Sequence, residues 1–188
     1  MLGSLLKTLL LLSFACSGNS WSRTVQKVMD IPTRPGVTER ALVITPESPQ
    51  AIAILFAGGH GGLQLDANGS ARWGEGNFLV RARQLFAAEG ILVAVLDAPS
   101  DRQMPPYLAG FRQRKEHADD VKAVIAALQA QVNKPVWLVG TSRGTQSVAY
   151  LATQLSGAEA AHGIVLTSTI LSDDKSRPVP DMPLSKIT

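Results

Sequence analysis

The chain of 188 residues has one cysteine, three histidines and few aromatic side chains, which make up 5% of the sequence. With Cys16 as the single cysteine, we expect no disulfide. One cysteine and three scattered histidines cannot assemble a zinc site, so we expect no bound metal. No motif indicates a cofactor.

The chain also lacks a strong excess of one charge. Its formal net charge is +3, spread along the sequence, and its densest basic cluster, at 112–115, is followed at once by acids at 116–120. This alternation predicts a solvated loop and helix start rather than a basic stripe. We therefore expect no nucleic-acid partner.

No internal repeat or low-complexity segment divides the chain. Hydrophobic residues make up 45% and charged residues 18% of the sequence, as in ordinary globular proteins. Its length leaves room for one domain with a sizeable core.

The N-terminus has a composition of its own. Lys7 precedes an apolar run at 8–15 that is too short to span a bilayer comfortably, and small residues follow at 15–18. This pattern predicts a signal peptide over residues 1–17, cleaved after Ser17 or a few residues later, and hence an exported, periplasmic or secreted protein. We expect membrane contact only through this segment.

Two other interpretations of the N-terminus remain. The segment could be an uncleaved anchor, or Cys16 could be the acylated first residue of a lipoprotein. The lipid-anchored form is the weaker of these, because Ser13 stands where that signal usually has leucine.

The most informative motif is G-x-S-x-G at Gly140–Gly144. An apolar run at 136–139 precedes it and predicts a buried strand, while apolar residues at helical spacing over 145–155 predict a helix after it. Strand, sharp turn and helix in this order are typical of a nucleophile elbow. Both glycines would be needed there, because a Cβ would clash with the neighbouring strand or helix. The alternative is a serine in an ordinary strand-to-helix loop.

The remaining pattern alternates strands with helices. We predict strands at 24–29, 40–45, 51–56, 91–96 and 163–166, helices at 77–88 and 116–130, a turn-rich segment at 32–36 and a glycine-rich loop at 57–62. Fully apolar strands separated by helices indicate an α/β fold, a mostly parallel sheet with helices on both faces.

These residues resemble the α/β-hydrolase superfamily, in particular its dienelactone-hydrolase-like or small exported esterase branches. The resemblance rests on the turn at 140–144 and on Phe56-Ala-Gly-Gly59 after the third strand, and we assign residues 23–188 to this domain. It implies Ser142 as nucleophile and the N–H groups of Gly58 or Gly59, with that of Arg143, as oxyanion donors. A phosphate-binding loop is the rival interpretation, but the spacings of phosphate-binding motifs are absent.

The family orders its triad as serine, acid, histidine. The one histidine after Ser142 is His162, which precedes Asp173, Asp174 and Asp181 and lies just before the last predicted strand, roughly 20 Å from the serine. We therefore predict a surface or loop role for His162. The resemblance implies that two further strands and a last helix, bearing the acid and the histidine, are missing, so we expect a domain incomplete at its C-terminus.

Several other residues have two interpretations each. His60 or His117, oriented by Asp97, could rebuild a dyad with Ser142; otherwise His60 shapes its loop, His117 is a solvated first-turn residue, and Asp97 caps a turn with Ser100. The acids Asp173 and Asp174 are predicted as solvated turn residues. Four aromatic residues could line a pocket or belong to the core: Trp73, Phe78, Tyr107 and Phe111.

Three functions follow from these features. The first is an exported serine hydrolase acting on a small-molecule ester or related acyl bond. The second is a catalytically incomplete fragment or non-catalytic remnant of such an enzyme, since an unassisted serine hydroxyl is a poor nucleophile. The third is a binding module that uses the pocket without chemistry.

Overall fold

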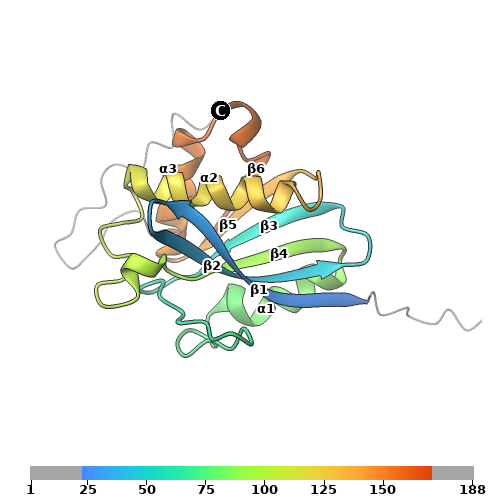
Figure 1. Ribbon diagram of the computed structural model, residues 1–188, viewed down its shortest axis with the longest axis horizontal. Helices are drawn as coiled ribbons and strands as arrows, with labels where there is room; N and C mark the ends of the chain where they lie inside the picture. The colour runs from blue at the N-terminus through green and yellow to red at the C-terminus, as the bar shows by residue number, and fades with distance from the viewer. Residues whose placement is uncertain (1–22, 171–188) are drawn as a thin grey trace, which may run out of the picture.

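One six-stranded sheet forms the centre of the computed structural model, which describes residues 23–170 (Figure 1). The predicted signal peptide, Asp173, Asp174 and Asp181 lie outside the described residues. The strands are β1 (Thr24–Arg34), β2 (Val37–Pro46), β3 (Ala51–Phe56), β4 (Ile91–Leu96), β5 (Val136–Thr141) and β6 (Gly163–Thr167). The helices are α1 (Phe78–Ala88), α2 (Lys115–Gln129) and α3 (Gly144–Gln154), with short 3-10 turns η1 (Ser100–Arg102) and η2 (Gly157–Glu159).

The strands lie in the order β1-β2-β4-β3-β5-β6. The pairs β1–β2 and β2–β4 are antiparallel, whereas β4–β3, β3–β5 and β5–β6 are parallel. This arrangement confirms the predicted mostly parallel sheet.

Helices cover both faces of the sheet, as predicted, with α2 and α3 on one side and α1 on the other (Figure 1). Successive residues of a strand point to opposite faces. In β3, Ile52 and Ile54 accordingly pack with α2 and α3, while Ala53 and Leu55 pack with α1. Burial on both faces explains why these strands are continuous apolar runs.

The direction in which strands are added to the sheet reverses at β3. It first passes from β3 through α1 to its neighbour β4, and then from β4 through α2 to β5, on the other side of β3. Right-handed crossovers in opposite directions place their helices on opposite faces. The carboxyl ends of β3 and β5 therefore border the crevice in which such sheets usually bind ligands.

The predicted turn-rich segment at 32–36 was too long. Strand β1 runs to Arg34 and β2 starts at Val37, so only Pro35 and Gly36 make the turn, with Gly36 at φ +72°. Pro32 pairs with Thr38 inside the hairpin. A proline is tolerated there because β1 is an edge strand, with a partner strand on one side only.

The three helices agree with the prediction to within one residue at each end. Asn77 caps α1, with its side chain accepting a hydrogen bond from the N–H of Leu79. Within residues 23–170, no helix is both long and apolar enough to cross a membrane.

His117 lies in the first turn of α2 but is buried, not solvated as one interpretation held. Its ring packs edge-on against Phe56 and Phe111, with centroid distances of 6.1 and 5.6 Å. Neither ring nitrogen has a hydrogen-bond partner among the described residues. Burial, aided by the charges of Arg112 and Arg34, lowers the pKa of His117 to about 3.

This shift predicts how stability depends on pH. The unfolded chain binds a proton at His117 below about pH 6.5, while the folded chain stays neutral there down to about pH 3. The contribution of neutral His117 is therefore complete above pH 6.5 and is lost as the pH falls. Relative to H117L, the free energy of unfolding of the wild type should drop by about 2 kcal/mol between pH 7 and pH 5, as measured by urea titration. A constant difference between the two proteins would contradict this.

Candidate active site

Ser142 sits in a sharp turn between β5 and α3, and strand, turn and helix follow one another as predicted. Its φ is +51°, in the left-handed region that is uncommon for serine. Its N–H donates to the carbonyl of Thr167 at 3.0 Å, and its carbonyl accepts from the N–H and hydroxyl of Thr145 at 3.0 and 2.6 Å. The strained turn is thus held from both sides, by β6 and by α3.

The two glycines of the motif are required by contact, which confirms the prediction. A Cβ on Gly140 would lie 2.7 Å from the carbonyl oxygen of Gly144, in the first turn of α3. A Cβ on Gly144 would lie 2.0 Å from the carbonyl oxygen of Phe56, at the end of β3. The start of α3 is therefore pressed against both neighbouring strands.

The turn brings Ser142 beside the glycine-rich loop that follows β3. A Cβ on Gly58 would lie 3.1 Å from the Cβ of Ser142 and 3.1 Å from the carbonyl oxygen of Thr141. Gly59 is exposed, at φ +64°, and a Cβ there would meet nothing within 4 Å. Of the two glycines implied as oxyanion donors, Gly58 is therefore the one in contact with Ser142. The third implied donor, Arg143, is the residue directly after the serine.

A buried cation holds this loop in place. The guanidinium of Arg112, 3% exposed, donates to the carbonyls of Ala57 and Gly59 at 3.0 and 3.4 Å and to the hydroxyl of Ser147 in α3 at 2.9 Å. The prediction of a solvated loop is therefore wrong for Arg112. Desolvation, and then the charge of Arg143, lowers the pKa of Arg112 to about 10, so the group stays charged at neutral pH.

The hydrogen bond from Arg112 to Ala57 also orients the peptide bond before Gly58. This bond is trans, and a trans peptide points its C=O and N–H in opposite directions. Since Arg112 binds the carbonyl of Ala57, the N–H of Gly58 points away from Arg112.

Asp97, at the end of β4, anchors the other end of the loop. Its carboxylate accepts hydrogen bonds from the N–H groups of Leu63, Gln64, Leu65 and Ala98, at 2.6 to 3.0 Å. With these bonds made, Asp97 neither orients a histidine nor caps a turn with Ser100. Both interpretations of this residue are therefore wrong. The hydroxyl of Ser100 instead accepts from the N–H of Thr38.

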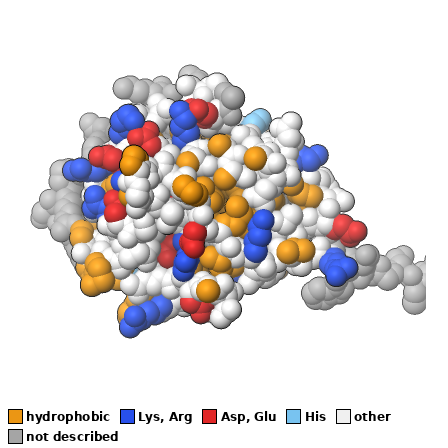
Figure 2. All heavy atoms as spheres, in the orientation of Figure 1, with side chains coloured by type: hydrophobic (Ala, Val, Ile, Leu, Met, Phe, Trp, Pro, Cys, Tyr) orange, Lys and Arg blue, Asp and Glu red, His pale blue; other side chains and the backbone are white. Residues whose placement is uncertain are grey.

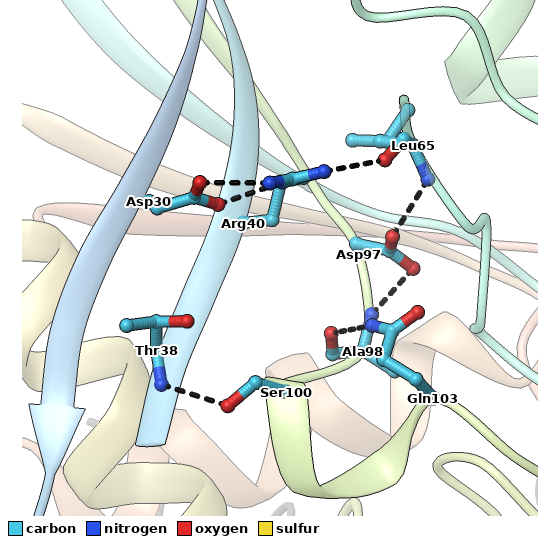
Figure 3. Close-up of a pocket in the computed structure, with 8 residues that line it drawn as sticks. All are labelled: Asp30, Thr38, Arg40, Leu65, Asp97, Ala98, Ser100 and Gln103. Atoms are coloured by element: carbon cyan, nitrogen blue, oxygen red, sulfur yellow. Dashed lines mark hydrogen bonds and ion pairs between the residues drawn. The ribbon is translucent and has the colours of Figure 1, made fainter. Parts of the chain in front are cut away.

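Two cavities flank the anchored loop. One, of about 350 Å³, is walled by the loop from Gly58 to Leu63 and by Gly74, Gly76 and Asn77. The other, of about 380 Å³, has charged walls that are already paired: Arg40 binds Asp30 at 2.6 and 2.8 Å and the carbonyl of Leu65 at 2.9 Å (Figure 3). Gly58, which contacts Ser142, also lines the glycine-walled cavity, so this cavity is the one next to the serine.

No hydrogen bond joins Ser142 to any of the three histidines, all of which the structure describes. His60 is exposed, stacks on Tyr107 at a centroid distance of 4.4 Å, and accepts at Nδ1 from the N–H of Gly62. His162 is exposed at the opposite edge of the sheet, where its backbone and ring bond Val136 at the start of β5, as predicted. The predicted dyads are therefore not formed in this structure.

The four aromatic residues divide between core and surface. Phe111 is a core residue, 1% exposed, whereas Trp73 and Phe78 are each 50% exposed and lie outside the walls of the glycine-walled cavity. Tyr107 supports the loop, since a Cβ on Gly62 would lie 2.2 Å from its ring.

Charged side chains of the described residues form neither a basic stripe on the face that is drawn nor a cluster suited to a metal ion. On the face shown in Figure 2, basic and acidic side chains are interspersed rather than gathered into a stripe. Over residues 23–170, no group of three or more His, Cys, Asp or Glu side chains is placed to hold a metal ion.

The fold has solved counterparts, although no protein-family model and no curated protein sequence matches the chain. A cold-adapted esterase from an Arctic intertidal metagenomic library matches with a TM-score of 0.53 and 14% identity, over 78% of this chain and 61% of that one. The chain has the α/β-hydrolase fold. A serine hydrolase involved in carbazole degradation matches with a TM-score of 0.51 and 16% identity, over 80% of this chain and 51% of that one.

A prolyl endopeptidase shares the α/β-hydrolase fold as well, with a TM-score of 0.53 and 16% identity, over 79% of this chain and 22% of that one. The chain thus spans less than two thirds of the length of each of these structures. At these identities, the likeness concerns the fold.

Two residues of the site were missed from sequence. Arg112 was grouped with its charged neighbours, and the one local signal of its burial is the aromatic Phe111 beside it. Asn77 was predicted only as the start of a helix, yet its side chain lines the glycine-walled cavity. No local pattern predicts either position, because both depend on the path of the loop at 57–77.

The contact between Gly144 and Phe56 predicts the result of a single added methyl group. G144A should lower the free energy of unfolding by about 3 kcal/mol or more, because backbone must move on one side or the other. G76A is the matched control: its Cβ meets nothing within 4 Å, so its effect should stay within about 0.5 kcal/mol. Urea unfolding measures both, and equal stability of the two variants would show that α3 is not pressed against β3.

Proposed function

We propose that Ser142 is the nucleophile of a serine hydrolase that acts on a small-molecule ester or related acyl bond. The observation that carries this proposal is the strained left-handed Ser142, at the carboxyl end of β5 and in contact with Gly58. The α/β-hydrolase fold supports it, since the solved structures of that fold compared above are hydrolases by their descriptions.

The reaction proposed is acyl transfer to serine followed by hydrolysis. The hydroxyl oxygen of Ser142 attacks the acyl carbon and gives its proton to a general base, which none of the three described histidines provides in this structure, while the carbonyl π electrons move onto the oxygen. The N–H groups of Gly58 and Arg143 would stabilise that oxyanion. The carbon–oxygen bond to the leaving group then breaks, the base protonates the leaving alcohol, and water hydrolyses the acyl-enzyme by the same steps.

The anchoring of the loop by Arg112 and Asp97 supports this role for Gly58. Preorganised donors stabilise a developing charge best, because they need no rearrangement during the reaction. The loop is fixed at Ala57 and Gly59 by Arg112 and at its far end by Asp97, so the direction of the Gly58 N–H is set before substrate binds.

The second candidate function is that of a catalytically incomplete or non-catalytic α/β-hydrolase chain. It is favoured by the placement of the histidines, since His117 is buried and His162 lies at the opposite sheet edge. His60, at the cavity wall, is stacked on Tyr107. The two functions differ in whether Ser142 reacts.

We also propose export, on the basis of Lys7, the apolar run at 8–15 and the small residues at 15–18. Expressed in bacteria with its own N-terminus, the protein should be recovered outside the cytoplasm, with a new N-terminus after Ser17 or a few residues later. L10R, which interrupts the apolar run, should keep it unprocessed. Unprocessed wild-type protein in the cytoplasm would contradict the proposal.

The reactivity of Ser142 decides between the two functions. A fluorophosphonate probe should label the full chain at Ser142, and the chain should turn over p-nitrophenyl acetate. S142A should abolish labelling and lower turnover by at least about 1000-fold. Mass spectrometry of peptides locates the label.

The matched control is S70A, which removes the hydroxyl of an exposed serine in the loop between β3 and α1. It should be labelled and should turn over substrate like the wild type. A folded wild type without labelling, or a label that persists in S142A, would favour the catalytically incomplete chain.

A further inference from the structure

We propose that Asn77 is a further catalytic residue: its side-chain amide donates a hydrogen bond to the acyl oxygen that becomes the oxyanion. The inference rests on the proposed role of Ser142. It assigns chemistry to a residue that the sequence identified only as the start of a helix.

The position of the amide carries the proposal. The Nδ2 atom of Asn77 lies 3.3 Å from the point where a Cβ on Gly58 would sit, and the Cβ of Ser142 lies 3.1 Å from the same point. The amide nitrogen and the serine thus both lie next to Gly58, and the carbonyl oxygen of Thr141 lies 3.1 Å from the same point. Asn77 also lines the glycine-walled cavity with Gly58.

The orientation of the amide is fixed by its other end. Its Oδ1 accepts the N–H of Leu79 at 3.2 Å, as the N-cap of α1. Its backbone is tied down too, because its N–H donates to Gly74 at 2.8 Å and its carbonyl accepts from Arg81 at 3.0 Å. Since Oδ1 is an acceptor in use, the NH₂ group is the end that faces Gly58.

The chemistry of the walls makes this donor distinctive. Glycines form most of the cavity wall, and the polar side chains that line it are those of His60 and Asn77. An amide N–H is neutral and cannot take a proton, so it can stabilise negative charge on an oxygen without competing with the general base.

Residue type separates the two roles of Asn77. Aspartate and serine cap helices about as well as asparagine, but neither carries an NH₂ group. If Asn77 served only α1, N77D and N77S would work as well as the wild type. As an oxyanion donor, Asn77 can be replaced by neither.

The test compares the wild type, N77D and N77S as full chains. The urea midpoints of the three should agree, because the cap is kept. In both variants the kcat for p-nitrophenyl acetate should fall about 100-fold with KM changed less than about threefold, because the bond strengthens in the transition state. Labelling of Ser142 by the fluorophosphonate should slow in parallel.

The matched control is N133D, which makes the same change at an exposed asparagine before β5, at the opposite end of that strand from Ser142. It should keep wild-type kcat. An active wild type with equally active N77D and N77S would overturn the role of Asn77 and leave that of Ser142 standing. A wild type that neither turns over substrate nor is labelled would overturn both.

Discussion

Among the described glycines, the tightest contact is the one between the first turn of α3 and the end of β3. The backbone of Gly144 approaches the carbonyl of Phe56 so closely that no side chain could fit between them. Everything else about the candidate site depends on this approach. It places the turn that carries Ser142 against the loop that starts at Ala57, and so brings together two motifs more than 80 positions apart in sequence.

The loop after β3 is held by two buried charges of opposite sign. Arg112 binds carbonyl oxygens near its start, and Asp97 binds N–H groups near its end. Hydrogen bonds to charged groups contribute about 1.5 to 3 kcal/mol each, so a glycine-rich segment with little packing of its own can still keep one conformation. The same glycines leave the cavity wall made of backbone, which is where a substrate carbonyl could approach closely.

The sequence was most informative where the pattern is local. The apolar runs of β3, β4 and β5 and the helical spacing of α2 predicted the core, because burial on both faces favours apolar residues along a strand. The requirement for Gly140 and Gly144 was predicted as well, since strand, turn and helix are adjacent in sequence. The mostly parallel sheet followed from the alternation of strands and helices, whereas the order β1-β2-β4-β3-β5-β6 was not predicted.

The local sequence patterns did not predict the contacts between residues far apart in sequence. Arg112, and His117 in one of its two interpretations, were expected in solvent because charged and polar neighbours surround them in sequence. Both are buried, Arg112 against backbone carbonyls of the loop after β3 and His117 against Phe56 and Phe111. Asp97 was considered as a partner for a histidine, but its partners are backbone N–H groups, three of them more than 30 positions away. Asn77 could be recognised as a cap from sequence, but its second contact, with Gly58, depends on a fold that no local pattern describes.

The central claim is that Ser142 reacts at a spot where backbone and side-chain donors converge beside Gly58. A crystal structure of the chain after reaction with a fluorophosphonate tests it most directly. The account predicts phosphorus bonded to the hydroxyl oxygen of Ser142, with a phosphoryl oxygen within hydrogen-bond distance of the Gly58 N–H and the Asn77 amide. An unmodified Ser142, or an adduct whose oxygen points away from the glycine-rich loop, would contradict it.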